Sequence, residues 1–60
     1  MSQVYNPEAD IIAEIERLEL ESRTIRRSVE HAHNNEDKRV LNRQLQELKE
    51  QIEYLKSRLP

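Results

Sequence analysis

Apolar residues recur along most of this chain at alternating steps of three and four positions. This spacing places them on one stripe of an α-helix, as in the seam of a coiled coil. The repeat occurs in two segments, and twelve of its thirteen positions are apolar. The first segment has Ile11, Ile15, Leu18, Ser22, Ile25, Val29 and Ala32, and the second has Leu41, Leu45, Leu48, Ile52, Leu55 and Leu59. The pattern therefore predicts two amphipathic helices.

Proline and asparagine mark the ends of these helices, because the chain has no glycine. Asn6-Pro7 is typical of a helix start, since Asn caps free backbone amides and Pro suits the first helical position. At Asn34-Asn35, one Asn in the left-handed region can end a helix, and either Asn can cap the next. We predict a flexible N-terminal tail at residues 1–6 and a hairpin domain over 7–60, with a helix at 7–33, a turn at 34–36 and a helix at 36–59.

The two apolar stripes are out of phase with each other. Continuing the first repeat would place Arg39 on the seam, so one straight helix would lose its stripe at the Asn pair. A continuous helix with a stutter is the alternative, and the middling helix propensity of Asn disfavours it. If the chain folds back, seam residues whose numbers sum to 70 face each other, as Ile25 does Leu45. We therefore predict an all-α fold, an antiparallel two-helix coiled-coil hairpin.

Charged residues beside the seam agree with this pairing. The antiparallel arrangement brings Glu19 to Lys49 and Glu14 to Arg58, and no like charges meet at these positions. Exposed ion pairs contribute only ~0.2–1 kcal/mol each. They therefore favour the register of the hairpin more than they stabilise it.

A lone hairpin of 60 residues has little core for its size. Two helices cover each apolar stripe from one side only, whereas ordering each residue costs about 1–2 kcal/mol of backbone entropy. Such a hairpin is marginally stable. We therefore expect a homodimer that forms a four-helix bundle, or a larger protein partner, to cover the open side of the seam.

Few apolar residues lie outside the seam, and they do not form one stripe. Ile12 lies beside the seam, and Val40 and Tyr54 share one heptad position of the second helix. We predict that Ile12, Val40 and Tyr54 contribute to a protein interface. The alternative is that they are scattered exposed side chains, which any protein surface carries.

Ser22 is the one polar residue on the seam, opposite Leu48. We expect its hydroxyl to donate to the carbonyl oxygen one turn earlier in the helix. The alternative is that the small side chain lets a second hairpin pack closely and fixes its register.

Composition excludes most chemical sites. Without cysteine or glycine, the chain has no disulfide, no thiolate metal site and no Gly-rich phosphate loop. His31 and His33 are two residues apart, so on a helix they do not face the same way, and we expect no metal site. Nothing suggests a nucleophile–base pair in an enclosed pocket. We expect a protein that is not an enzyme and binds no cofactor and no small-molecule substrate.

The longest apolar run is Ile11-Ile12-Ala13, which is too short to span a membrane or to form a signal-peptide core. We therefore expect a soluble cytoplasmic protein with no membrane partner.

Charge is divided along the predicted hairpin, although the net charge is only −2. Residues 23–43, near the turn, carry six cations against three carboxylates, and the rest of the chain carries four cations against nine carboxylates. The basic end can meet the acidic end of a second copy or a phosphate backbone. The arginines that would contact phosphates are Arg23, Arg26, Arg27, Arg39 and Arg43.

These features indicate a binding role. We expect a non-catalytic helical module for protein–protein interaction (an adaptor, inhibitor or assembly factor) that acts through the outer faces of a homodimeric hairpin. One alternative is a nucleic-acid-binding hairpin dimer that uses the basic turn end. Another is a structural subunit of a larger assembly, ordered only when bound.

Overall fold

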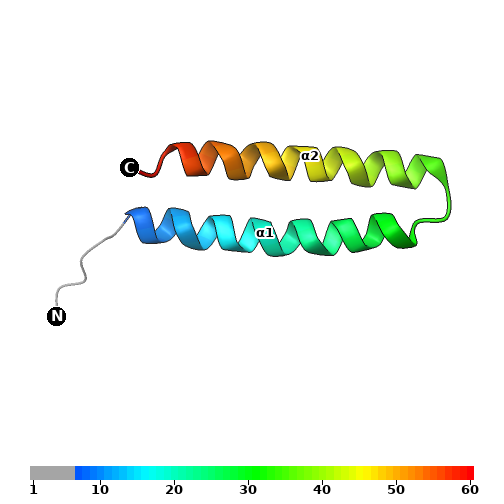
Figure 1. Ribbon diagram of the computed structural model, residues 1–60, viewed down its shortest axis with the longest axis horizontal. Helices are drawn as coiled ribbons and strands as arrows, with labels where there is room; N and C mark the ends of the chain where they lie inside the picture. Colours follow the sequence, from blue (N-terminus) through cyan, green and yellow to red (C-terminus); the bar gives the residue numbers. More distant parts are fainter. Residues whose placement is uncertain (1–6) are drawn as a thin grey trace.

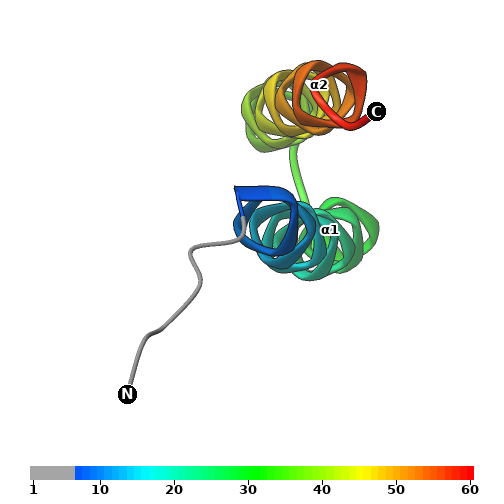
Figure 2. The same ribbon diagram turned by 90° about the vertical axis from the view of Figure 1, so that its left-hand side faces the viewer.

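The computed structural model describes residues 7–60 as two packed helices joined by a short connection. Helix α1 (Pro7–His31) and helix α2 (Asn35–Ser57) run antiparallel, side by side (Figure 1). Viewed end-on, they form two neighbouring rods, and the described part of the chain contains no strand (Figure 2). The predicted all-α two-helix hairpin is confirmed. The tail predicted at residues 1–6 lies outside the described residues.

Each helix begins where the sequence can satisfy free backbone amides. Helix α1 begins at Pro7, whose missing N–H has no cost at the first helical position. Helix α2 begins after its N-cap Asn34, whose backbone is extended (φ −128°, ψ 162°). The Asn34 side chain accepts a hydrogen bond from the Asp37 backbone N–H at 2.7 Å and donates one to the Asp37 carboxylate at 3.1 Å. Asn34 therefore caps the second helix, which is one of the two roles expected of the Asn pair.

The connection between the helices lies earlier than predicted. It comprises residues 32–34 rather than 34–36, because α1 ends at His31 and α2 already begins at Asn35. Helix α2 also ends at Ser57 rather than at residue 59. Beyond it, the Leu59 backbone N–H donates to the Lys56 carbonyl at 3.1 Å, so the chain keeps a helix-like path to its last seam residue.

The prediction that an Asn in the left-handed region ends the first helix is wrong. No described residue has a positive φ. Asn34 is instead used as the N-cap of α2, which requires an extended backbone. Helix α1 ends with a tighter turn, in which the Ala32 N–H donates to the Val29 carbonyl at 3.2 Å.

The stripe predicted from the repeat is the face on which the helices pack. All thirteen seam residues are buried or half-buried, and Glu14 is the one other described residue that is not exposed. Ile15, Leu18 and Leu48 form the centre of the core, with exposed fractions of 7%, 4% and 8%. The other ten seam residues stay partly open to solvent. The hairpin therefore exposes the edges of its seam on both of its faces.

Candidate interaction surface

The hairpin has two broad faces, one on each side of the plane that contains both helices. Successive seam residues lean alternately toward one face and the other, because the repeat alternates steps of three and four. Ser22 and Leu45 lean toward one face, which we call the Ser22 face. Ile25 and Leu48 lean toward the opposite one, which we call the Glu47 face. Each face has a hollow at the middle of the hairpin.

The Ser22 face carries a groove between the two helices. One hollow of about 330 Å³ surrounds Ser22, and a second of about 310 Å³ adjoins it and shares Ser22, Arg26 and Lys49 with it. We call the two hollows together the Ser22 groove. Its lining consists of Glu19, Ser22, Arg23, Arg26, Asn42, Leu45, Gln46, Lys49, Ile52, Glu53 and Lys56.

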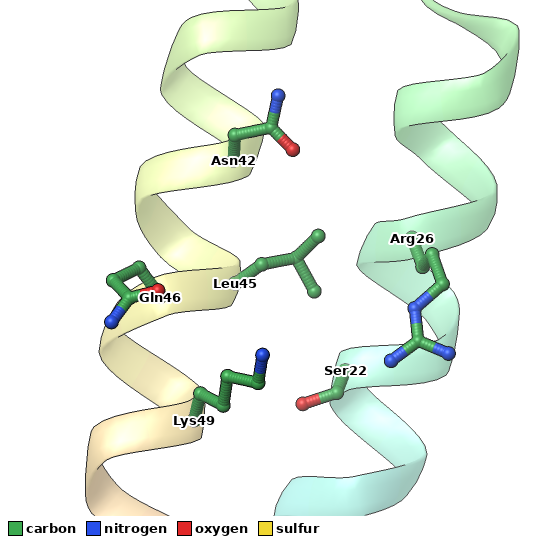
Figure 3. Close-up of a pocket in the computed structure, with 6 residues that line it drawn as sticks. All are labelled: Ser22, Arg26, Asn42, Leu45, Gln46 and Lys49. Carbon is green, nitrogen blue, oxygen red and sulfur yellow. The ribbon is translucent and has the colours of Figure 1, made fainter.

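Ser22 leaves the floor of this groove open. Its oxygen points across toward α2, while the Leu45 side chain extends from α2 toward α1 (Figure 3). The expected bond from the Ser22 hydroxyl to the preceding turn is absent among the described hydrogen bonds. Thr24 and Ser28 do make such bonds, to the Leu20 carbonyl at 3.2 Å and the Thr24 carbonyl at 3.1 Å. Ser22 therefore presents a small side chain and a hydroxyl group to the groove.

Cations dominate the middle of the Ser22 groove. Arg26 and Lys49 flank Ser22, and no carboxylate lines the hollow around it (Figure 3). Arg23 lies in the adjoining hollow. None of these three cations has an ion-pair partner among the described residues. The hollow around Ser22 thus offers uncompensated positive charge, two amides and a hydroxyl, which are groups that bind carboxylates or phosphates.

The ion pair between the helices differs from the predicted one. Lys56 Nζ lies 3.9 Å from Glu19 Oε2, so Glu19 pairs with Lys56 rather than with Lys49. Lys49 and Lys56 lie on the same stripe of α2, one heptad apart. Along the helix axis, Glu19 of α1 lies between the heights of the two lysines. Its carboxylate can therefore reach either one, and the heptad position alone does not decide which.

The Glu47 face has the opposite charge. Its central hollow, of about 240 Å³, is lined by Glu21, Ile25, Gln44, Glu47, Leu48 and Gln51, so it contains two carboxylates and no cation. Glu21 of α1 and Gln51 of α2 lie in this one hollow. At the turn end, Ser28 and Leu41 share another hollow on this face.

Glu14 pairs within its own helix, so the predicted pair with Arg58 is wrong. The Arg17 Nε donates to the Glu14 carboxylate at 3.4 Å, and Arg17 Nη1 lies 3.7 Å from Glu21. The hydrogen bond from Arg17 holds the pKa of Glu14 below its usual range, and the same bond raises the pKa of Arg17. The Arg58 guanidinium instead lies 6.0 Å from the centre of the Tyr54 ring. Each of these arginines therefore uses a neighbour one turn away.

The three apolar residues predicted for an interface do not gather in one patch. Ile12, Val40 and Tyr54 are 46%, 57% and 64% exposed. Ile12 lies on the Ser22 face, on the stripe of Glu19 and one heptad before it. Val40 lies in the hollow at the turn end of the Glu47 face. Tyr54 shares the heptad position of Val40 but lies two heptads away.

The five arginines of the basic cluster are all exposed. Two of them, Arg23 and Arg26, line the Ser22 groove. Arg27 and Arg43 occupy the heptad position opposite the seam in their own helices, so they lie on opposite edges of the hairpin. The basic turn end is therefore spread around the hairpin, and two of its arginines, Arg23 and Arg26, meet at the Ser22 groove.

Sequence reasoning singled out Ser22, Arg23 and Arg26 but missed the groove that joins them to Asn42 and Gln46. The heptad positions could have revealed the groove, because these five residues all lie on the same side of the seam. Of the two histidines, His31 ends α1 and His33 lies in the connection. Among residues 7–60, no group of three metal-ligating side chains could hold an ion. Neither described helix is long and apolar enough to cross a membrane.

No protein-family model, no characterised protein and no solved structure matches this chain. The function is therefore proposed from the chemistry of the two faces and from the exposure of the seam.

Proposed function

We propose that this chain is a non-catalytic module for protein–protein interaction whose working form is a homodimer, with two coiled-coil hairpins packed as a four-helix bundle. One observation carries the proposal: ten of the thirteen seam residues remain partly exposed in the single hairpin. Full burial of an aliphatic side chain contributes ~1.5–3 kcal/mol. A second hairpin on one face would bury the exposed edges of the seam residues that lean toward that face, and so gain part of that free energy.

Such a bundle leaves the outer sides of all four helices free. An adaptor, inhibitor or assembly factor needs this arrangement, since the seam supplies the stability and the outer sides supply the contacts. Leu20, which is 60% exposed on α1, is the kind of apolar residue that such a contact would cover.

Sedimentation equilibrium across a wide range of protein concentration tests the homodimer. We expect the mass to rise from 7.2 kDa toward twice that value as the concentration increases. A chain that stays at the single-chain mass while it is fully helical and unfolds cooperatively would overturn the proposal.

The unpaired arginines favour a second candidate function, nucleic-acid binding. None of the five arginines Arg23, Arg26, Arg27, Arg39 and Arg43 forms an ion pair among the described residues. Phosphate contacts of this kind weaken steeply with salt. Fluorescence anisotropy with labelled RNA and DNA at low salt measures such binding. Replacing Arg26 and Arg27 by alanine should abolish it, while Arg58→Ala, at the open end of the hairpin and outside the Ser22 groove, should not. No binding at low salt would end this candidate.

A further inference from the structure

We infer that the second hairpin packs on the Ser22 face with its turn at the opposite end, so that α1 lies antiparallel to α1 of the second copy. This inference rests on the proposed homodimer and adds the face that is covered and the direction of packing. The occupant of the Ser22 groove is thus a second copy of this chain.

The charges along one edge of the groove carry the inference. Glu16 and Glu19 lie on this edge of α1 toward the open end, and Arg23 and Arg26 continue it toward the turn. An antiparallel α1 pair centred at residue 21 brings Glu16 to Arg26 of the second copy and Glu19 to Arg23 of the second copy. By the two-fold symmetry each pair forms twice, which is the self-complementarity that a symmetric interface requires.

The rest of this edge is compatible with the same centre. At the next positions outward on this edge, Ile12 faces Glu30 of the second copy, so no like charges meet there. On α2, Gln46 comes to Glu53 of the second copy. Lys49 lies near the two-fold axis and faces Lys49 of the second copy. This is the one like-charge contact along these two edges.

The other arrangements bring like charges together. If both turns pointed the same way on the Ser22 face, α1 would lie over α2 of the second copy. Arg23 would then face Lys49 and Glu19 would face Glu53, against one attractive contact, between Glu16 and Lys56. Packing through the Glu47 face would bring Glu21 against Glu47 of the second copy if the turns shared one end, and Glu21 against its own copy if they lay at opposite ends; no cation lines that hollow. Arg17, which lies 3.7 Å from Glu21, offsets only part of this charge. Like charges at an interface disfavour it.

Ser22 gives this face room for close packing. It lies next to the centre of the α1 pair, and its small side chain leaves the hollow of about 330 Å³ around it. Small residues at a helix crossing let the backbones approach, and a neighbouring side chain can fill the space they leave. The sole polar position of the seam is therefore the place where a second copy fits.

Charge reversal tests the face and the pairing. In sedimentation equilibrium, Arg26→Glu should weaken the dimer about tenfold, because two attractive contacts become repulsive. Adding Glu16→Arg to the same chain should restore the wild-type affinity. Lys49→Gln should tighten the dimer, since it removes the like-charge contact. Glu47→Arg, a charge reversal of the same size on the opposite face, is the matched control and should not weaken the dimer.

The direction of packing is measured with a spin label. The chain has no cysteine, so His33→Cys gives one labelling site beside the connection. In the antiparallel dimer the two labels are about 36 Å apart along the helix axis, because each lies 12 residues from the centre at 1.5 Å per residue. With the turns at the same end, the labels would lie side by side.

The outcomes separate this inference from the proposed function. A wild-type chain that stays monomeric overturns both. A wild-type dimer in which Glu16→Arg fails to rescue Arg26→Glu, or in which the two labels lie within about 20 Å along the helices, overturns the inference alone and leaves the homodimer standing.

Discussion

At the scale of single residues, burial distinguishes the leucines that hold the helices together from those that do not. Leu48 is 8% exposed at the centre of the core, whereas Leu20 is 60% exposed on the outer side of α1. We expect Leu48→Asp to unfold the hairpin, because it places an unpaired carboxylate among apolar side chains. Leu20→Asp introduces the same charge in solvent and should leave thermal unfolding, followed by circular dichroism, almost unchanged. Equal losses of helix in the two variants would contradict this assignment of the core.

The Glu14–Arg17 contact gives a prediction about pH. Because the hydrogen bond from Arg17 lowers the pKa of Glu14 in the folded chain, ionised Glu14 favours folding. Its contribution is present above the ordinary pKa of a Glu carboxyl and is lost as the pH falls through the lowered value. The contribution is small, since the pair is exposed and screened by solvent.

An NMR titration of the side-chain carboxyls measures this effect directly. Replacing Arg17 by glutamine should raise the pKa of Glu14 toward its ordinary value. Arg23→Gln removes a cation from the same helix that does not contact Glu14, so it should leave that pKa in place. A Glu14 pKa that does not respond to Arg17→Gln would show that the hydrogen bond is not its cause.

At the scale of the helices, the N-cap of α2 yields the sharpest pair of variants. Asn34 accepts the Asp37 N–H, whereas its neighbour Asn35 is already the first helical residue. Asn34→Ala should lower the free energy of unfolding by about 1 kcal/mol, as measured by urea denaturation. Asn35→Ala should have little effect, since alanine suits a helix. If Asn35→Ala costs more than Asn34→Ala, Asn35 is the cap and α2 starts one residue later.

The ends of the helices also show what the sequence could and could not predict. The apolar repeat predicted the buried face residue by residue, because burial of a stripe depends only on helical periodicity. It extended the first helix too far, since Ala32 continues the repeat although α1 has ended at His31. The choice between Asn34 and Asn35 depends on which side-chain oxygen reaches an amide in the first turn, which periodicity does not contain.

Side-chain pairing was predicted less well than the backbone. Glu19 and Glu14 were placed correctly beside the seam, but each pairs with another cation than expected. A heptad position fixes where a side chain leaves the helix, whereas a long side chain can reach several partners. The Ser22 groove also depends on how side chains from the two helices meet. The heptad positions of its residues can be read from the sequence, but only the packed helices show that these residues line one hollow.

At the scale of the whole molecule, the proposed dimer links stability to assembly. A hairpin whose core has three buried side chains leaves most of its seam half-covered, so the same stripe that folds the chain is available to a second copy. Any ligand that binds only the folded form stabilises it by mass action, and in the proposed dimer a second copy is such a ligand. The dimer and the fold should therefore respond together to the protein concentration.

This linkage predicts the thermal unfolding of the intact chain. Between about 1 μM and 100 μM, the midpoint measured by circular dichroism should rise with concentration, because unfolding releases two chains from each dimer. Arg26→Glu should lower the midpoint at every concentration, and the Arg26→Glu and Glu16→Arg double variant should recover it. A midpoint that is sharp and independent of concentration would mean a self-sufficient monomer. A chain that is mostly coil over the whole range would instead support the structural-subunit alternative, in which another protein supplies the missing side of the seam.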